Sequence, residues 1–443
     1  MTSENFAASK LPELKFEKYQ LPNGLDVILH EDHSIPIVAV NIWYHVGSKN
    51  ERRGRTGFAH LFEHMMFQGS KHHEDEYFAP LQKIGGTLNG STNNDRTNYW
   101  ENVPSNYLEL VLWLESDRLG FLLPSMTQKK LDNQRDVVKN ERRQRYENQP
   151  YNKIYDLMPQ FMFPSDHPYS WSVIGSMADL SAASLEDVSE FFRTYYTPNN
   201  ASLCIAGDFK PEEAKRLVEK YFGPIPAGPP VDRLETWIPK LEGMRRLVSE
   251  DNVNLPRLYY TWHTPALYAP GDAEFDLLAS ILTSGKTSRL FKTLVYDKQI
   301  AQDVSAYQYS RELGSTFNIE VTAKEGHTLE ELETAVDAEL KKLMAQGVTA
   351  GELSKAQNEY EAGFVRSLES LGGFSGRADR LNGYNILLGD PGKVQWDLDR
   401  YTRVTPADLL RTMKQYLDLD QRGIAHIVPH TASVAKAQDV DRS

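Results

Sequence analysis

The sequence predicts an α+β protein of two structurally similar domains, each a mostly antiparallel sheet with helices packed on it. Three observations lead to this prediction. The chain has 443 residues, enough for two or three domains with their own cores. Residues 222–240 carry five prolines and no helical periodicity, and they divide the chain near its middle. The order strand, strand, helix occurs on both sides of this stretch.

In the first half, strands are predicted within residues 19–32 and 36–48, with a tight turn at Asn23-Gly24. A helix with His60 and His64 follows. In the second half, the corresponding stretches are residues 245–251, 256–266 and a helix over 273–285. Two long helices are predicted over 128–148 and 349–370. We therefore expect an N-terminal domain over residues 1–225, a linker over 226–237 and a related C-terminal domain over 238–443.

Composition and charge exclude several classes of protein. The net charge of −12 argues against a nucleic-acid binder, and no apolar run reaches the roughly 18 residues of a membrane span. Cys204 is the only cysteine, so no internal disulfide can form, and its apolar surroundings predict a buried strand thiol. The N-terminal stretch lacks a cationic start followed by an apolar segment, which predicts a cytoplasmic protein, or a periplasmic one if the start is processed.

The helix after the first strand pair carries a polar cluster of His60, Glu63 and His64 between Phe, Leu and Met residues. Positions i, i+3 and i+4 share one face of a helix, so the three side chains point into one volume. One interpretation is a pair of core histidines beside a surface glutamate. The other is a metal site, because burying three ionisable groups together is costly without a compensating ion. Two imidazoles suit zinc, and H-x-x-E-H is the inverzincin motif, with Glu63 placed to act on a water.

Two histidines leave a tetrahedral zinc site short of one protein ligand. In the helix over 128–148, Leu131, Gln134, Val138 and Glu141 recur at spacings of three, four and three. That face is expected to pack inward and to place two polar residues at core positions. The alternative is a surface helix in which residues 141–145 form a solvated run of charge, and the residues alone leave both interpretations open.

These motifs together resemble the pitrilysin/insulinase family of zinc metallopeptidases, and within it the two-domain type similar to mitochondrial processing peptidase. The matching stretches occur in family order within residues 21–294. They are "LPNGLDVIL", "HVGSKNERRGRTGFAHLFEHMMFQGS", "GGTLNGSTNNDRTNYW", "VVKNERRQRYENQPY", "HPYSWSVIGS", "YYTPNNASLCIAGDF" and "LTSGKTSRLFKTL".

The resemblance implies a role for each polar residue. In the family pattern the third zinc ligand is a glutamate separated by 76 residues from the second histidine, which places it at Glu141 (141 − 64 − 1 = 76). Glu63 would be the general base that takes a proton from the attacking water. Where many relatives have a second glutamate, this chain has Gln134, whose amide can still donate hydrogen bonds around the site.

The resemblance also implies that Asn89, Gly90, Ser91 and Thr92 form an edge strand beside the zinc ion. An extended peptide would add to this strand through main-chain hydrogen bonds, which favours unfolded peptides as substrates. Read without the resemblance, this stretch is a surface hairpin.

The chain departs from the family in its second half. Relatives that act as one chain carry an Arg and a Tyr there, whereas the aligned residues here are Val295 and Gln302. Arg289 and Tyr296 show the same spacing, which we interpret as coincidence. The departure predicts that the chain is the zinc-bearing subunit of a bacterial two-chain enzyme, with a related partner that supplies the Arg and Tyr.

The alternative to this peptidase is a non-catalytic scaffold or assembly subunit of the same family. The intact set of His60, Glu63, His64 and Glu141 argues against it. One further stretch, residues 370–384, contains four glycines. It lies outside the strand and helix context of a phosphate-binding loop, so we predict an ordinary connection there, with a mobile loop near the substrate as the alternative.

Overall fold

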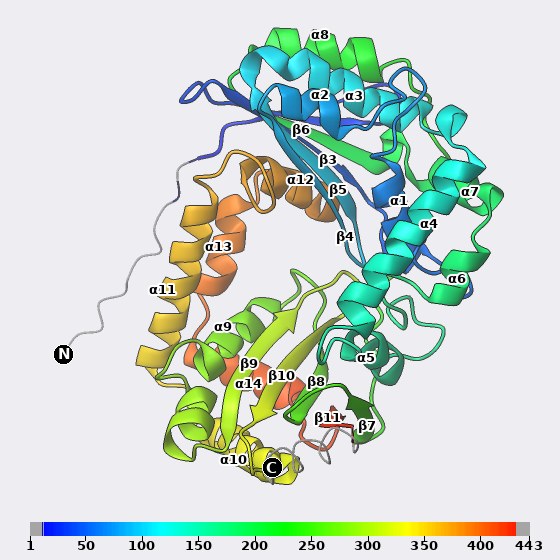
Figure 1. Ribbon diagram of the computed structural model, residues 1–443. Coiled ribbons are helices and arrows are strands. Elements are labelled where there is room, and N and C mark those ends of the chain that lie inside the picture. Colours follow the sequence, from blue (N-terminus) through cyan, green and yellow to red (C-terminus); the bar gives the residue numbers. More distant parts are fainter. Residues whose placement is uncertain (1–10, 12, 431–443) are drawn as a thin grey trace. The chain divides into compact units, whose positions relative to one another are not determined.

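The structure is a computed structural model that describes residue 11 and residues 13–430 (Figure 1). The chain forms two compact units. The first unit comprises the described residues up to Arg142, together with Trp171–Arg233 and Gly363–Leu398. The second unit comprises Arg143–Ser170, Leu234–Ala362 and the described residues from Asp399 onward.

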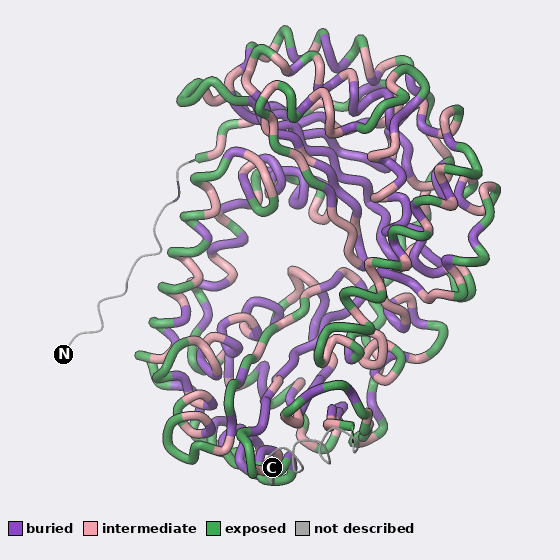
Figure 2. Tube along the Cα trace, viewed as in Figure 1, coloured by how far each residue is buried: buried purple, intermediate pink, exposed green. Residues whose placement is uncertain are grey.

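The first unit is built on a six-stranded sheet with the order β1-β2-β6-β3-β5-β4. Neighbouring strands are antiparallel except for the parallel pair β2 and β6. The central strands are buried along their length (Figure 2), and Cys204 on β6 is fully buried, as predicted. The six strands are β1 (Glu17–Gln20), β2 (Asp26–Glu31), β3 (Ile37–Tyr44), β4 (Thr87–Thr92), β5 (Thr97–Pro104) and β6 (Ala201–Gly207).

Helices cover both faces of this sheet. Helices α1 (Phe58–Met65) and α3 (Leu108–Phe121) contact β5 from one face, and α12 (Arg377–Leu388) packs on β3 and β6 from the other. The remaining helices that lie wholly in the first unit are α2 (Phe78–Lys83), α4 (Gln128–Arg142), α6 (Met177–Ala182), α7 (Leu185–Tyr195) and α8 (Pro211–Phe222). None of the helices in the described part of the chain is long and apolar enough to cross a membrane.

The second unit repeats the topology of the first. Its sheet has the order β7-β11-β8-β10-β9, and β7 and β11 form its one parallel pair. This order matches β2-β6-β3-β5-β4. Along the chain, α1 follows the strands β2 and β3, as α9 (Asp272–Thr283) follows β7 and β8. The strands are β7 (Arg245–Asp251), β8 (Arg257–Thr264), β9 (Ala301–Tyr309), β10 (Ser315–Ala323) and β11 (Gly423–Pro429). The predicted α+β class with two mostly antiparallel sheets is confirmed.

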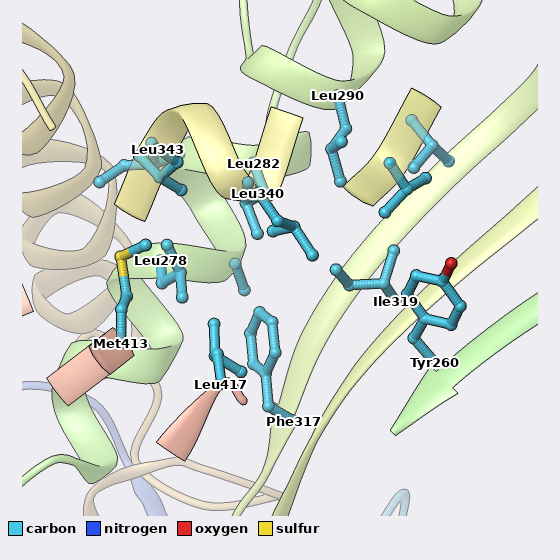
Figure 3. Packing of buried hydrophobic residues seen from close by; sticks show 14 of the residues in the cluster. Tyr260, Leu278, Leu282, Leu290, Phe317, Ile319, Leu340, Leu343, Met413 and Leu417 are labelled. Atoms are coloured by element: carbon cyan, nitrogen blue, oxygen red, sulfur yellow. The ribbon is translucent and has the colours of Figure 1, made fainter. Parts of the chain in front are cut away.

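The core of the second unit lies between one face of its sheet and the helices that cover this face. Figure 3 shows Phe317 and Ile319 of β10 packed near Leu278 and Leu282 of α9 (Asp272–Thr283), with Met413 of α14 (Pro406–Tyr416) beside them. The other helices of this unit are α5 (Ile154–Met162) and α10 (Leu329–Gln346). Two helices, α11 (Ala350–Ser367) and α13 (Val394–Thr402), run across the division between the units.

Two segments of the chain belong to a different unit from their neighbours in the sequence, so the units are not contiguous domains. The chain passes from the first unit to the second at Arg233–Leu234, inside the predicted linker. However, residues 143–170 belong to the second unit, because Ile154 of α5 packs with Tyr259 of β8. Residues 363–398 belong to the first unit, because Asn382 of α12 bonds to Asn41 on β3.

The second unit contains a buried histidine that should make its stability depend on pH. His263 on β8 packs against Phe163, and burial lowers its pKa from 6.5 to about 4. As the pH falls from 6.5 to 4, the unfolded chain binds the proton and the folded unit does not. The free energy of unfolding of this unit should therefore fall by about 3 kcal/mol. Hydrogen exchange of β8 peptides should show this loss in the wild type and a smaller one in His263→Gln. Equal losses in the two proteins would contradict the prediction.

Candidate active site

Helix α1 carries the predicted polar cluster. His60 and His64 lie one turn apart on it, and their rings meet edge to face with 4.8 Å between centroids. His60 is buried and His64 is partly exposed. The helix also packs against α4 and β4 (Figure 1). The helical spacing therefore brings both imidazoles to the same side of α1, as the sequence predicted.

Glu141 comes from the end of α4 and completes the group. Its Oε2 atom lies 3.1 Å from Nε2 of His64 and 3.7 Å from Nε2 of His60. Ligands about 2.0–2.2 Å from a tetrahedral ion lie roughly 3.4 Å from one another, and the observed separations bracket that value. Two imidazole nitrogens and a carboxylate oxygen are also the donor set of catalytic zinc sites. The three ligand atoms lie within 4.8 Å of one another, so these side chains form a group that could hold a zinc ion.

Helix α4 changes its winding directly after this ligand. Residues Arg143–Glu147 form a π-helical turn, a feature that is frequent at functional sites. Leu131, Gln134 and Val138 are the buried residues of α4, which confirms the predicted inward face. The structure thus places Gln134 in the interior on the helix of Glu141, and its support of the zinc ligands stays a prediction.

Glu63 lies between the two histidines in the sequence and points toward β4. The side chain of Thr92, the last residue of β4, lies near its carboxylate. Burial raises the pKa of Glu63, while the Thr92 side chain and the neighbouring His64 favour the charged form. A carboxylate beside the ligand group can accept a proton from a water molecule there.

A residue that the sequence interpretation did not assign, Glu51, fixes the start of α1. Its Oε2 atom accepts the backbone N–H of Gly57 at 2.9 Å, and its Oε1 atom accepts that of Ala59 at 2.8 Å. Burial raises the pKa of Glu51 to about 8, and the N–H groups of Gly57, Phe58 and Ala59 oppose this shift. Since both oxygens accept N–H groups, the geometry fits the carboxylate, which also complements the helix dipole.

The same end of α1 is braced from the other ligand helix. Gly57 adopts a left-handed conformation (φ 87°) and lies so close to Gly175 that a Cβ on Gly175 would fall 2.4 Å from the Gly57 Cα atom. Arg142, the residue after Glu141, donates a hydrogen bond to the Gly175 carbonyl at 2.9 Å. One backbone contact and one hydrogen bond therefore connect the helix of the two histidines with the helix of the glutamate.

Replacing Glu51 with Gln should weaken zinc binding. The amide keeps one acceptor but directs an NH2 group at a backbone donor, so the first turn of α1 loses a fixed partner. We expect zinc affinity, measured by competition with a chromogenic chelator, to fall about 10- to 100-fold. Glu109→Gln is the matched control, because Glu109 is an exposed acid of the same unit that pairs with Lys220. Equal affinities in the two variants would contradict the role of Glu51.

The predicted substrate strand forms the edge of the first sheet. Among the strands of residues 13–430, β4 pairs only with β5, and the backbone register places Asn89 opposite Trp100 and Ser91 opposite Asn98. The N–H of Gly90 donates to the side-chain Oδ1 of Asn89 at 2.8 Å. The structure thus brings Asn89, Gly90, Ser91 and Thr92 to an edge beside α1, and their contact with a peptide stays a prediction.

Comparisons with known proteins agree with this geometry. Residues 26–166 match the family described as insulinase, peptidase family M16, and residues 182–360 match the peptidase M16 inactive domain. Over 430 residues the chain is 30% identical to the zinc protease PqqE of Helicobacter pylori, covering 96% of this chain and 94% of that protein. The chain belongs to the insulinase family of peptidases. With its His60, His64 and Glu141 group, it is a zinc protease, and the scaffold alternative is not supported.

Other relatives place the chain within this family. It is 24% identical over 364 residues to an Arabidopsis thaliana protein named "Probable mitochondrial-processing peptidase subunit beta, mitochondrial", covering 79% of this chain and 67% of that protein. A crystal structure of a protease from Helicobacter pylori superposes with a TM-score of 0.86 at 27% identity, covering 94% of this chain and all of the other. Both the sequence and the fold therefore agree with a two-domain peptidase.

The second unit differs from the family pattern at the positions where an Arg and a Tyr are expected. Val295 is partly buried against the core of the second unit, and Gln302 is exposed on the edge strand β9. Arg289 forms a paired hydrogen bond with Glu352, at 2.6 and 2.8 Å, and is mostly buried. Tyr296 is 73% exposed. Arg289 is thus engaged within its own unit, in agreement with the interpretation of its spacing as coincidence.

Replacing Tyr296 should have little effect on catalysis. Because we assign its match to the family spacing to chance, Tyr296→Phe is expected to keep kcat/KM for an unstructured peptide within about twofold of the wild type, as for surface substitutions away from a site. A loss of tenfold or more in the Phe variant would show that this hydroxyl takes part in the reaction.

Proposed function

We propose that the protein hydrolyses peptide bonds in unstructured peptides, with His60, His64 and Glu141 as zinc ligands and Glu63 as general base. The proposal rests on three ligand atoms, from His60, His64 and Glu141, that lie within 4.8 Å of one another. The Glu63 carboxylate lies beside them, on the helix that carries the two histidines. When bound, zinc supplies Lewis-acid polarisation of the peptide carbonyl and of the attacking water.

The chain's own residues would move the proton. Glu63 takes a proton from the attacking water at a carboxylate oxygen and later delivers it to the departing amine nitrogen. The Thr92 side chain lies near that carboxylate. Because Thr92 is also the last residue of β4, the base and the strand that would bind the substrate are fixed to each other.

The substrate would bind as an added strand. β4 offers a free edge, and an extended peptide can pair with it through main-chain groups, displacing the Asn89 side chain from the Gly90 N–H. Such binding recognises the main chain of the peptide more than its side chains, and it requires an extended segment. Folded proteins are therefore poor substrates in this proposal.

The hydrolysis is tested with an unstructured peptide that carries a fluorophore and a quencher. Cleavage by the protein purified from its own cells, so that associated chains are retained, should stop with a zinc chelator and return when zinc is added back. Cleavage that continues in the zinc-free protein would contradict the proposal.

We also propose that the protein acts as the zinc-bearing chain of a heterodimer, whose related partner supplies an Arg and Tyr pair. Val295 and Gln302 stand where such a pair is expected, and the relative from Arabidopsis is named as one subunit of a processing peptidase. Addition of the partner should raise peptide cleavage at least about tenfold. A purified chain that reaches the same cleavage rate without the partner would contradict the heterodimer. The compartment, cytoplasmic or periplasmic, stays a prediction.

A further inference from the structure

The face of the first sheet opposite α1 carries a pair of aromatic residues, a half-buried Trp100 and an exposed Phe374. Side chains alternate along β5: Tyr99 contacts Phe67 on the side of α1, whereas Asn98 bonds to Asp379 of α12 at 2.8 Å. Trp100 follows Tyr99 and therefore lies on the face of α12. Its ring meets that of Phe374 edge to face, with 5.6 Å between centroids.

The glycine-rich loop before α12 holds Phe374 in place. The Ser375 N–H donates to Asp379 Oδ2 at 2.8 Å, and the Ala378 N–H donates to the Leu371 carbonyl. Gly372 packs directly on the sheet, because a Cβ there would fall 1.9 Å from Oδ1 of Asn102. The predicted connection over residues 370–384 is wrong for residues 377–384, which belong to α12. Its first part, residues 370–376, is a tightly anchored loop that presents a phenyl ring 46% exposed.

The pair lies beside the middle of the proposed substrate strand. Trp100 is opposite Asn89 in the register of β5 and β4. A peptide added to β4 would run two strand spacings, roughly 10 Å, from the β5 backbone. A substrate side chain on this face and the indole of Trp100 together span that distance, and alternate residues of the peptide point to this face.

The nearby acidic group does not favour a basic side chain. Asp379 Oδ1 accepts hydrogen bonds from Trp43 Nε1 at 2.7 Å and from Asn98, and its Oδ2 accepts the Ser375 N–H. These donors already use both oxygens of the carboxylate. What the pair offers a ligand is therefore apolar ring surface, and this matches an aromatic or large aliphatic side chain.

We propose that Trp100 and Phe374 form a specificity subsite for one large apolar side chain of a peptide bound along β4. The proposal rests on the proposed function and adds a preference to it. A bound side chain would remove the exposed Phe374 ring from water. The subsite would select which register of a peptide is presented to the zinc ligands, since the main-chain pairing itself is tolerant of sequence.

The test uses the Glu63→Gln protein, which should bind peptides without cutting them. Labelled unstructured peptides identical except for a Phe or an Ala, moved through successive positions, are titrated by fluorescence anisotropy. We expect one position at which Phe binds about 10-fold more tightly than Ala. Adding Phe374→Ala should reduce that preference to about twofold and leave the Ala peptide unchanged, whereas adding Phe374→Leu should keep most of the preference.

Trp396→Ala is the matched control, because Trp396 is an exposed aromatic residue of α13 in the same unit. It should leave the Phe preference unchanged. A preference that survives Phe374→Ala, or the lack of a Phe preference at every position, overturns the subsite while peptide binding itself stands. Lack of binding of every peptide to the Glu63→Gln protein overturns the proposed function and the subsite with it.

Discussion

Replacing Glu63 with Gln is expected to lower the rate of peptide hydrolysis about 1,000-fold and to leave one zinc ion bound per chain. The amide has nearly the shape of the carboxylate and can still accept a hydrogen bond. It cannot accept a proton from the attacking water. The measurement is kcat/KM for the quenched peptide, together with zinc content by atomic emission.

Glu109→Gln provides the control for this substitution, because it removes an exposed carboxylate of the same unit that pairs with Lys220. It should leave both the rate and the zinc content unchanged. A Glu63→Gln protein that keeps its rate would refute the role of Glu63 as general base. One that loses zinc would show that Glu63 also helps to bind the metal.

Removal of a ligand should give the opposite combination of effects. His64→Ala takes away one imidazole, and we expect zinc affinity to fall at least about 100-fold and hydrolysis to fall with it. Glu141 then loses a neighbour 3.1 Å away, so the remaining two ligands cannot close a three-ligand site. Zinc affinity is measured by chelator competition and hydrolysis with the quenched peptide.

His72→Ala is the matched histidine control. His72 belongs to the same unit, and its partly exposed ring bonds to Asp117. Its removal should change neither zinc affinity nor hydrolysis. Tight zinc binding by His64→Ala would contradict the assignment of His64 as a ligand.

The ligand group could be predicted from the sequence because its information is local or carried by resemblance. His60, Glu63 and His64 lie within one helical turn, so their common face follows from helix geometry alone. For Glu141, the periodicity left two interpretations open, an inward-facing residue or part of a solvated run of charge. The resemblance favoured its role as a ligand. The structure then brought the three ligand side chains together.

The supports of the site could not be predicted in the same way. Glu51 bonds to backbone N–H groups six and eight residues ahead, across a turn whose path the sequence does not specify. In the sequence, the Glu51 cap leaves only a weak signal, an acidic residue shortly before an apolar helix. The assignment of α12 to the first unit depends on hydrogen bonds more than 300 residues apart, such as that between Asn382 and Asn41, which local pattern cannot reveal.

The topology of the two units was partly visible. Strand, strand and helix recur in both halves, and the sheets share one order of strands. By sequence, we align Asp276 and Ser280 of the second copy with His60 and His64 of the first, so in this interpretation only one copy has kept the polar cluster. Pairing between distant strands, such as β2 with β6, depends on the assembled sheet and had no local signal.

The most direct test of the central claim is X-ray absorption at the zinc K edge of the purified protein. We expect one zinc ion per chain with nitrogen and oxygen ligands at about 2.0–2.2 Å and imidazole scattering from two histidines. The imidazole contribution should fall in His64→Ala, measured with zinc added. A zinc-free wild-type protein, or a spectrum that is the same in His64→Ala, would contradict the account.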